Sequence, residues 1–491
     1  MIYYQGRQFM VYYDAQLQLC LSRKSEEGEW MKIVFPPEDS LSNGRNRRGV
    51  AYDTHNTPNV AISPVDGTVH LAWDHHVSEL SYRVSKPGAA TVSDDEWNLS
   101  LFKPKQNYLK EGQPLIITYP TFVVGQHNRL LMFWREGYPS RGELFTSEYR
   151  NGSWSGKVKV TAAGGGTYAN SPDRFSYPNE VKYQNGKLHL TWCWREESTA
   201  ASNHDLMYAY SEDNGRTWKN TTGAVVGTSG PESMKMNINS PGVKVWTIGY
   251  DKDLINQNST TIDRNGNVHV VLRHSDEEGG VQAYYHYRLV NEQWSRRKIP
   301  LAAGRRAKLY VDPTDNTLYL VANVSNRIRI YSARSKNSWA TWNEIYVSSA
   351  NYTNATNGQI SRDGTTLWVM GQRSGTGLRS RLDLITFTLN NTNEINLLSR
   401  NTLQTNAPTK TYRAERVLYP NPTQDYVEIP RSLSEPVVRY AIYDTTGSLV
   451  KEETALGPRQ TQIDFSKYRA GWYIIEVEGG MRTETFRVVK E

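Results

Sequence analysis

Residues 58–85 read "PNVAISPVDGTVHLAWDHHVSELSYRVS", a stretch with the pattern of three short β-strands. Apolar and polar residues alternate on both sides of a tight turn at Asp66-Gly67, as expected for a hairpin in a half-buried sheet. The second strand is rich in Val, Leu and Trp, and the third carries a tyrosine. Amphipathic-helix spacing is not sustained here or elsewhere in the chain. The stretch therefore predicts a strand-turn-strand unit of an all-β protein.

The same unit recurs along the chain. It starts again at six further positions, which are Gln8, Pro120, Pro178, Ser259, Ala307 and Asn357. Repeats of this length indicate a β-propeller built from four-stranded blades. A β-sandwich would need shorter and less regular spacing between strands. The seven units predict a seven-bladed β-propeller over residues 1–390.

One turn within the repeats has a sequence of its own, "SEDNGRTW" at residues 211–218. It matches the Asp-box pattern, which is typical of propellers of the sialidase type. In such a turn Asp213 accepts hydrogen bonds from its own backbone, Gly215 supplies a positive φ and Trp218 is a buried plug. We interpret this turn as evidence for the fold and not for a catalytic site.

The composition limits the possible partners. The 491 residues carry a formal charge of +7, which suits either an ordinary, mildly basic protein or one that attracts an acidic polysaccharide. No dense Lys/Arg block favours nucleic acid, and no apolar run is long enough to span a membrane. The two cysteines, Cys20 and Cys193, fall inside expected strands and show no metal-ligand spacing. We expect buried free thiols.

The pattern changes after Leu389. Residues 391–416 are mostly polar and predict a linker. Residues 417–491 predict a small β-sandwich and contain "YPNP" (419–422), "IYDTTGSLV" (442–450), "AGWYIIEV" (470–477) and "FRVVK" (486–490). This module resembles the C-terminal sorting domain of type IX secretion cargo in Bacteroidetes. The alternative is a carbohydrate-binding appendage.

The sorting-domain resemblance implies a secreted or cell-surface protein with the type IX secretion machinery as a partner. Such cargo needs an N-terminal export signal, but the start "MIYYQGRQFM" has neither a basic region nor an apolar one. The first repeat also has few residues before its strands. We therefore expect the true N-terminus to lie upstream of residue 1.

The chain has ten histidines, and several fall into a pattern. Three share one position of the repeat, in "VHLAW", "LHLTW" and "VHVVL", and are expected in the core: His70, His189 and His269. His55 and His75 lie outside that position, one before and one after the hairpin of residues 58–72. A strand-turn-strand unit returns both ends to the same rim, where imidazoles can transfer protons near neutral pH. The sequence does not decide whether the adjacent His76 belongs to the core or to the rim.

The next two repeats carry other polar side chains at equivalent places. Tyr119 and Tyr177 occupy the position of His55, whereas Arg135 and Arg195 occupy that of His75. Residues at the same ends of successive strands point to one shared cavity. For Tyr177 and Arg195 the alternative is that they only pack the rim. Asn203 and His204, on a loop beside Arg195, are further candidates for substrate contact.

The segments "YDTHNTPN", "DGTVHLAWDHH", "TYPTF", "FWREG" and "NHDLMYAYSEDNGRTW" resemble the propeller-type ulvan lyases of polysaccharide lyase families 24 and 25. The resemblance covers residues 8–390 and implies a catalytic group of His55, His75, Tyr119 and Arg135. In such an enzyme an arginine neutralises the uronate carboxylate with a bidentate fork. His and Tyr then remove the C5 proton and protonate the leaving oxygen at C4.

The resemblance implies an acidic sulfated polysaccharide as the partner and a monomeric enzyme that requires no cofactor. Tyr177, Arg195, Asn203 and His204 are then expected to bind substrate. A structural calcium or zinc ion fits related folds, but no ligand cluster here assigns a metal. Two other functions stay open. One is a sialidase-like glycoside hydrolase, although no convincing arginine triad is found, and the other is a non-catalytic glycan-binding propeller.

Overall fold

The computed structural model describes residues 1–14, 16–25, 28–41, 55–138, 141–230, 233–374, 381–389, 395–402, 411–413, 416–417, 423–428, 437–444, 449–454, 462–479 and 482–491. The chain divides into two compact units. Unit 1 comprises residues 1–32 and 36–410, and unit 2 comprises residues 33–35 and 411–491.

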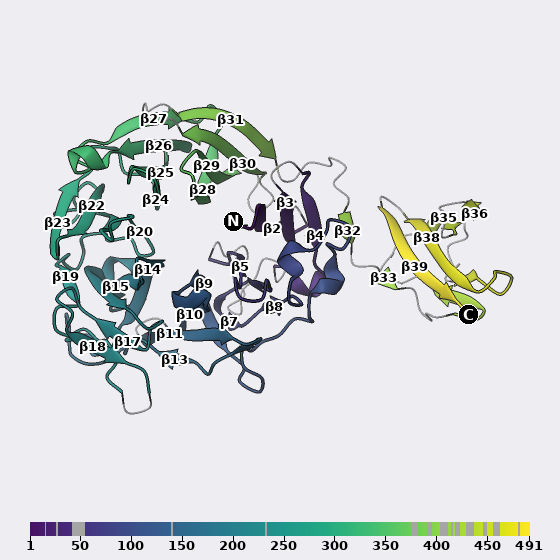
Figure 1. The fold of residues 1–491 in the computed structure, drawn as a ribbon, viewed down its shortest axis with the longest axis horizontal. Helices are drawn as coiled ribbons and strands as arrows, with labels where there is room; N and C mark the ends of the chain where they lie inside the picture. Colours follow the sequence, from purple (N-terminus) through teal and green to yellow (C-terminus); the bar gives the residue numbers. More distant parts are fainter. Residues whose placement is uncertain are drawn as a thin grey trace. The chain divides into compact units, whose positions relative to one another are not determined.

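Unit 1 is a ring of antiparallel sheets, as Figure 1 shows. One sheet contains β1 (Ile2–Tyr4), β2 (Arg7–Tyr13), β3 (Leu19–Ser25) and β4 (Met31–Val34), and another contains β5 (Asn59–Ile62), β6 (Val69–Ala72) and β8 (Tyr82–Val84). A third contains β20 (Ser259–Ile262), β21 (Val268–His274), β22 (Ala283–Val290) and β23 (Gln293–Lys298). The next has β24 (Lys308–Val311), β25 (Leu318–Val324), β26 (Arg327–Ala333) and β27 (Asn343–Val347). The last has β28 (Tyr352–Ile360), β29 (Thr366–Arg373), β30 (Leu382–Leu389) and β31 (Ile395–Thr402).

The remaining strands of unit 1 join into one large sheet. Its members are β7 (His76–Glu79), β9 (Ile116–Val124), β10 (Leu130–Tyr138), β11 (Arg141–Arg150), β12 (Ser153–Trp154), β13 (Val158–Lys159), β14 (Phe175–Gln184), β15 (Lys187–Arg195), β16 (Asn203–Ser211), β17 (Thr217–Lys219), β18 (Val225–Thr228) and β19 (Lys244–Trp246). A single parallel pair, Gly142 with Phe175, links its two halves. A Cβ at residue 142 would lie 1.5 Å from the Phe175 ring, so only glycine permits this approach.

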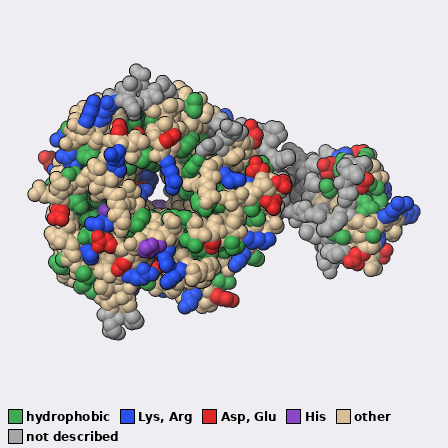
Figure 2. All heavy atoms as spheres, in the orientation of Figure 1, with side chains coloured by type: hydrophobic (Ala, Val, Ile, Leu, Met, Phe, Trp, Pro, Cys, Tyr) green, Lys and Arg blue, Asp and Glu red, His purple; other side chains and the backbone are tan. Residues whose placement is uncertain are grey.

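The first strands of successive hairpins line the inside of the ring. β5 packs against β9, β9 against β14, β14 against β20, β20 against β24, and β24 against β28. Figure 2 shows an opening at the centre of the ring, with Lys and Arg side chains on its rim. Side chains on these inner strands therefore share one central space.

All helical segments in the described residues are single 3₁₀ turns, which agrees with the expected absence of helices. They are η1 (Pro37–Asp39), η3 (Ala89–Thr91), η4 (Leu99–Leu101), η5 (Gln126–Asn128), η6 (Ala200–Ser202) and η7 (Ser335–Asn337). Across the described part of the chain, no helix has the length and apolar character needed to cross a bilayer.

Each sequence repeat contains the antiparallel hairpin that was expected of it. The hairpins are β2–β3, β5–β6, β9–β10, β14–β15, β20–β21, β24–β25 and β28–β29. The prediction of an all-β fold is therefore confirmed. The second strands of these hairpins are rich in Val, Leu and Trp. Their central residues are buried in the cores of the sheets.

The three histidines of the repeat are core residues, as predicted. Nδ1 of His70 lies 2.6 Å from the Tyr82 hydroxyl, and Nδ1 of His189 lies 2.9 Å from the Tyr208 hydroxyl. His269 makes the same kind of contact with the next strand, because its Nδ1 lies 3.0 Å from Nε2 of His286. Burial lowers the pKa of His70 to about 3 and that of His189 to about 4. These imidazoles are neutral, internal hydrogen-bonding groups.

The turn at residues 211–218 has the contacts expected of its residues. Asp213 Oδ1 accepts hydrogen bonds from the Ser211 hydroxyl at 2.7 Å and from the Thr217 amide at 2.8 Å. Gly215 has a φ of 84°, and Trp218 is 2% exposed. These contacts close the turn between β16 and β17.

Two further sequence predictions have clear outcomes. Cys20 in β3 and Cys193 in β15 are buried free thiols, as expected. The predicted linker at 391–416 is wrong for residues 395–402, which form β31 and pair with β30. In this outer strand, Leu397 and Leu398 are exposed, at 45% and 67%. The strand therefore lacks the apolar and polar alternation of a half-buried strand, and its polar sequence was interpreted as a linker.

Unit 2 is also made of strands. They are β32 (Thr411–Arg413), β33 (Arg416–Val417), β34 (Tyr426–Glu428), β35 (Val437–Tyr443), β36 (Leu449–Thr454), β37 (Gln462–Asp464), β38 (Gly471–Gly479) and β39 (Arg482–Lys490). One sheet has the order β33-β39-β38-β35-β36, and β34 pairs with β37 in a second. Side chains from both sheets, such as Val427, Ile463, Ile475 and Phe486, form one core.

Candidate active site

Two backbone irregularities shape the inner rim where β7, β9 and β10 meet. The pairing of β7 with β9 shifts register after His76, at Val77, whose φ is 56°. The pairing of β9 with β10 shifts beside Tyr119, whose φ is 54°. Positive φ is strained for a β-branched or aromatic residue, and such strain concentrates at functional sites. Bulges of this kind redirect side chains, here those of His76 and Tyr119.

The redirected side chains meet His55, which precedes β5. The rings of His55 and His76 stack, with centroids 4.2 Å apart. The Tyr119 ring lies 5.9 Å from that of His55 and 6.2 Å from that of His76. His55 is exposed, and the other two are partly exposed. Two imidazoles and a phenol, all able to exchange protons, therefore occupy one accessible spot.

A guanidinium also lies next to the Tyr119 ring. Cζ of Arg135 is 5.2 Å from the Tyr119 ring, 4.4 Å from that of Phe175 and 3.9 Å from that of Tyr177. Arg135 is 4% exposed, and its Nε and Nη1 have no hydrogen-bond partner among the described residues. Aromatic faces attract the cation but leave its donors unsatisfied. The arrangement suits an anion, such as a carboxylate.

Tyr177 and Arg195 extend this group. Nη1 of Arg195 donates a 3.1 Å hydrogen bond to the Tyr177 hydroxyl, and the rings of Tyr119 and Tyr177 are 6.4 Å apart. Nε of Arg195 donates to the carbonyls of Glu197 and Thr199, each at 3.0 Å. These bonds fix the direction of Arg195 toward Tyr177. The site is thus a continuous row from His55 to Arg195.

The structure does not bring His75, also predicted for the site, into this group. His75 is 1% exposed, and its Nε2 accepts a 2.9 Å hydrogen bond from the Ser81 amide. Burial lowers its pKa to about 3, so it stays neutral and enclosed. The adjacent His76 occupies the position beside His55 and Tyr119 that was expected for His75. Neighbouring residues of an extended chain face opposite sides, so only one of the two histidines can do so. The sequence showed both histidines but not which one faces the centre.

The predictions for Asn203 and His204 as substrate contacts are also wrong. Both are 0% exposed. Nδ2 of Asn203 donates a 2.7 Å hydrogen bond to the Leu254 carbonyl. The ring of His204 stacks on that of Tyr168, with centroids 3.8 Å apart. Neither side chain is accessible to a polysaccharide.

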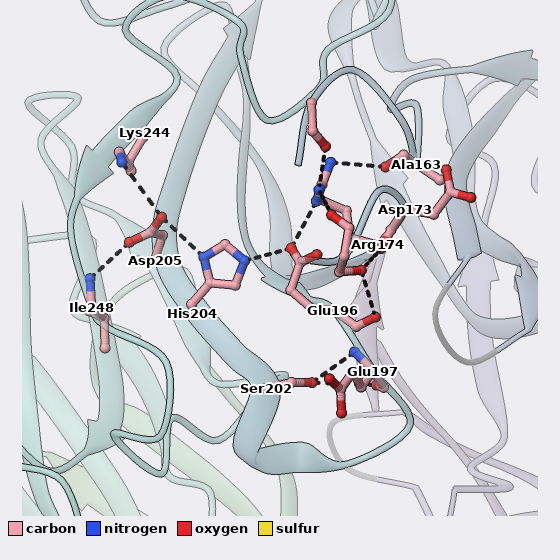
Figure 3. A network of polar contacts seen from close by, with 12 residues as sticks. Ala163, Asp173, Arg174, Glu196, Glu197, Ser202, His204, Asp205, Lys244 and Ile248 are labelled. Carbon is pink, nitrogen blue, oxygen red and sulfur yellow. Dashed lines mark hydrogen bonds and ion pairs between the residues drawn. The ribbon is translucent and has the colours of Figure 1, made fainter. Parts of the chain in front are cut away.

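His204 instead belongs to a buried charge network, drawn in Figure 3. Its Nε2 lies 2.8 Å from Oε1 of Glu196, and its Nδ1 lies 3.1 Å from Oδ2 of Asp205. Nε of Arg174 donates to the same Oε1 of Glu196 at 2.8 Å. Burial alone would lower the pKa of His204, but the bonds to Asp205 and Glu196 outweigh it and raise that pKa. The network is structural.

A metal centre is not evident. Among the described residues, His, Cys, Asp and Glu side chains form no group of three or more that could hold an ion. The positive charge next to Tyr119 comes from Arg135. Residues that sequence reasoning missed at this site are His76, which stood beside the wrong choice, and Phe175, for which no sequence signal was available.

Comparisons with known proteins bear on both units. Residues 7–302 match the model described as BNR repeat-containing family member, and residues 417–491 match the secretion system C-terminal sorting domain. The sorting domain identifies a protein that is secreted to the cell surface or beyond it.

Curated relatives include ulvan lyases. The chain is 26% identical over 320 residues to the short isoform of an ulvan lyase from Alteromonas sp. (strain LOR), covering 54% of this chain and 58% of that protein. It is 24% identical over 318 residues to a long isoform from Pseudoalteromonas sp. (strain PLSV), covering 55% and 31%. The matched part thus spans little more than half of one relative and less than a third of the other.

Two solved structures are similar in fold. The polysaccharide lyase Uly1 superposes with a TM-score of 0.63 at 20% identity, covering 81% of this chain and 89% of that one. An ulvan lyase described as a new family, PL25, superposes with a TM-score of 0.57 at 13% identity, covering 81% and 93%. At these identities the likeness establishes the all-β, propeller-like fold alone.

Proposed function

Because the chain belongs to the BNR repeat-containing family, we propose that it is a polysaccharide lyase that cleaves ulvan or a similar sulfated, uronate-containing glycan. The observation that carries the proposal is the buried guanidinium of Arg135, whose Nε and Nη1 lack hydrogen-bond partners in the described part of the chain. A buried charge without a partner is costly, and a bound carboxylate would satisfy it. The relatives named ulvan lyase support this choice of substrate.

The proposed reaction is a β-elimination. The carboxylate of the uronic acid binds the planar fork of Arg135, which withdraws charge and makes the neighbouring C5 proton more acidic. A base removes that proton, the electron pair forms the C4–C5 double bond, and the C4–O bond breaks. An acid protonates the leaving oxygen. The products are a new chain end carrying a hydroxyl and an unsaturated uronyl end.

The groups that transfer these protons are His55, His76 and Tyr119. The Tyr119 ring lies within about 6 Å of the guanidinium of Arg135 and of both imidazole rings, so a uronate held by Arg135 is placed near all three. A base and an acid must each be within hydrogen-bond reach of their atoms. Tyr177 and Arg195 continue the row and bind the adjoining part of the glycan.

The architecture completes the proposal. The sheets of unit 1 fit a seven-bladed β-propeller whose last blade ends with β31, at Thr402. The domains are then this propeller, a short linker, and a β-sandwich at residues 417–491 that serves the type IX secretion machinery. We further propose that the enzyme acts as a monomer and needs no cofactor.

The test is the product. Purified protein is incubated with ulvan while near-ultraviolet absorbance and new reducing ends are both measured. A lyase yields both signals in step, because each cleavage creates one unsaturated uronyl end. New reducing ends without absorbance would show hydrolysis and refute the elimination. Binding without either signal would show a non-catalytic glycan-binding protein. The Tyr119→Phe variant is the control for a contaminating lyase.

A further inference from the structure

An arginine that the proposed reaction does not use, Arg306, stands at the same central space. It lies between β23 and β24 and is exposed. Its Nε donates a 2.7 Å hydrogen bond to the carbonyl of Asn256, and its Nη2 donates a 2.8 Å bond to Oδ1 of the same residue. Asn256 is 6% exposed. One buried asparagine thus holds one edge of the guanidinium, and Nη1 has no partner among the described residues.

The position of Arg306 relates it to the candidate active site. Although the residue as a whole is exposed, desolvation of its guanidinium by the surrounding protein lowers the pKa of Arg306, and the phenol groups of Tyr119 and Tyr177 act on it electrostatically. β24, which begins two residues after Arg306, packs against β20, and β20 packs against β14, the strand of Tyr177. The guanidinium therefore approaches the tyrosines from the neighbouring inner strands, beside the row of His55 to Arg195.

A second positive charge stands next to it. Arg273, the penultimate residue of β21, donates hydrogen bonds to Gln282 Oε1 and to the carbonyl of Gly304, and it repels Arg306. Among the described residues, the charge of Asp253 acts on Arg273, whereas no carboxylate acts on Arg306. Two arginines held side by side create a local positive potential that an anion can neutralise. Figure 2 shows Lys and Arg side chains around this opening.

We infer that Arg306, supported by Arg273, is a second anion-binding subsite, which takes a sulfate ester of the sugar next to the uronate held by Arg135. The inference rests on the proposed function. Arg135 already accounts for the carboxylate, and the next anionic group along a sulfated uronate glycan is the sulfate of the adjoining sugar. Asn203 and His204, which the sequence suggested as substrate contacts, are buried, whereas Arg306 lies on a different part of the chain.

The experiment compares Arg306→Gln with the wild type on ulvan and on chemically desulfated ulvan. Loss of a charge-assisted hydrogen bond is expected to lower kcat/KM on ulvan by about 10- to 100-fold, mainly through KM. On desulfated ulvan the variant and the wild type should have equal kcat/KM. Arg297→Gln, which removes the same charge from the outer strand β23, should match the wild type on both substrates.

Two results would overturn the inference. One is an Arg306→Gln variant with unchanged kcat/KM on ulvan. The other is an equal loss on both substrates, which would mean that Arg306 acts on a carboxylate or on Tyr119 and not on sulfate. Calorimetric binding of ulvan separates this inference from the reaction. If the wild type forms no absorbing product but Arg306→Gln weakens binding only to the sulfated polymer, the lyase reaction fails and the sulfate subsite stands.

Discussion

The imidazole rings of His55 and His76 stack on each other, with centroids 4.2 Å apart and planes 25° apart. This contact joins the segment before β5 to the first residue of β7, and it places both rings next to Tyr119. The neighbouring His75 is excluded from the group because it is buried against the Ser81 amide. Two adjacent histidines therefore have different expected roles, and substitution can separate them.

His76→Gln should lower kcat on ulvan by about 10²- to 10⁴-fold, the usual loss when a general acid or base is removed. His75→Gln is the matched control. It should keep kcat but lower the free energy of unfolding by about 1–3 kcal/mol, because the Ser81 amide loses its buried acceptor. Initial rates from product absorbance and urea denaturation measure the two effects. The opposite pattern would return His75 to the catalytic group.

Arg135→Lys should lower kcat/KM severely, by about 10²-fold or more, since the loss of a positioned charge donor typically costs that much. Lysine keeps the positive charge but cannot offer two parallel donors to a carboxylate. Circular dichroism should show an intact fold. Arg297→Lys on β23 serves as the control for a change of arginine to lysine alone. Near-normal turnover by Arg135→Lys would disprove its role in holding the uronate.

The buried network predicts how stability depends on pH. The pKa of His204 is raised above its ordinary 6.5, so its contribution is complete below 6.5 and is lost as pH rises through the folded-state value. Burial would raise the pKa of Glu196, but bonds to His204 and Arg174 lower it below 4.5. The contribution of Glu196 is therefore present above pH 4.5 and is lost as pH falls through its folded-state value.

His204→Gln should reduce the free energy of unfolding by about 3–5 kcal/mol at pH 6, because one partner leaves a buried ionic network. It should also flatten the decline in stability above pH 6.5. His189→Gln is the control, since the pKa of His189, about 4, lies outside that window. Urea unfolding from pH 5 to 9 provides the measurement. A wild-type slope retained in His204→Gln would count against this assignment.

Removal of metal ions should leave turnover unchanged. The proposed elimination uses the charge of Arg135 and the proton-transferring groups of His55, His76 and Tyr119. Protein dialysed against EDTA and then assayed in metal-free buffer should keep its kcat and KM on ulvan. Loss of activity that returns on adding calcium or zinc would reveal a metal requirement and would contradict the prediction.

Deletion of residues 411–491 should abolish secretion while the purified protein retains its kcat and KM. The reason is that the candidate site lies entirely in unit 1, whereas the sorting-domain match covers residues 417–491. Secretion is followed by the protein's distribution between cells and medium, and turnover is followed by product absorbance. A folded truncation without turnover would mean that unit 2 takes part in catalysis.

The repeat pattern by itself determined the fold class. Each hairpin repeats the same order of strand, turn and strand. The alternation of apolar and polar residues along a strand depends only on local chain geometry, so it can be seen in the sequence itself. The same logic identified the core histidines, exemplified by His70 and His189, because they share one position of the repeat. It also placed Tyr119, Arg135, Tyr177 and Arg195 at equivalent strand positions, and the structure brings these four together.

The tertiary structure decided what depends on register and on contacts between distant segments. The bulges at Val77 and Tyr119 determine that His76, and not His75, faces the centre, since a shift of one residue reverses the side of a strand. His204 is buried because Glu196 and Asp205 surround it, which sequence spacing does not reveal. Arg306 lies far along the chain from Tyr119, and only the tertiary structure lets the two groups interact electrostatically.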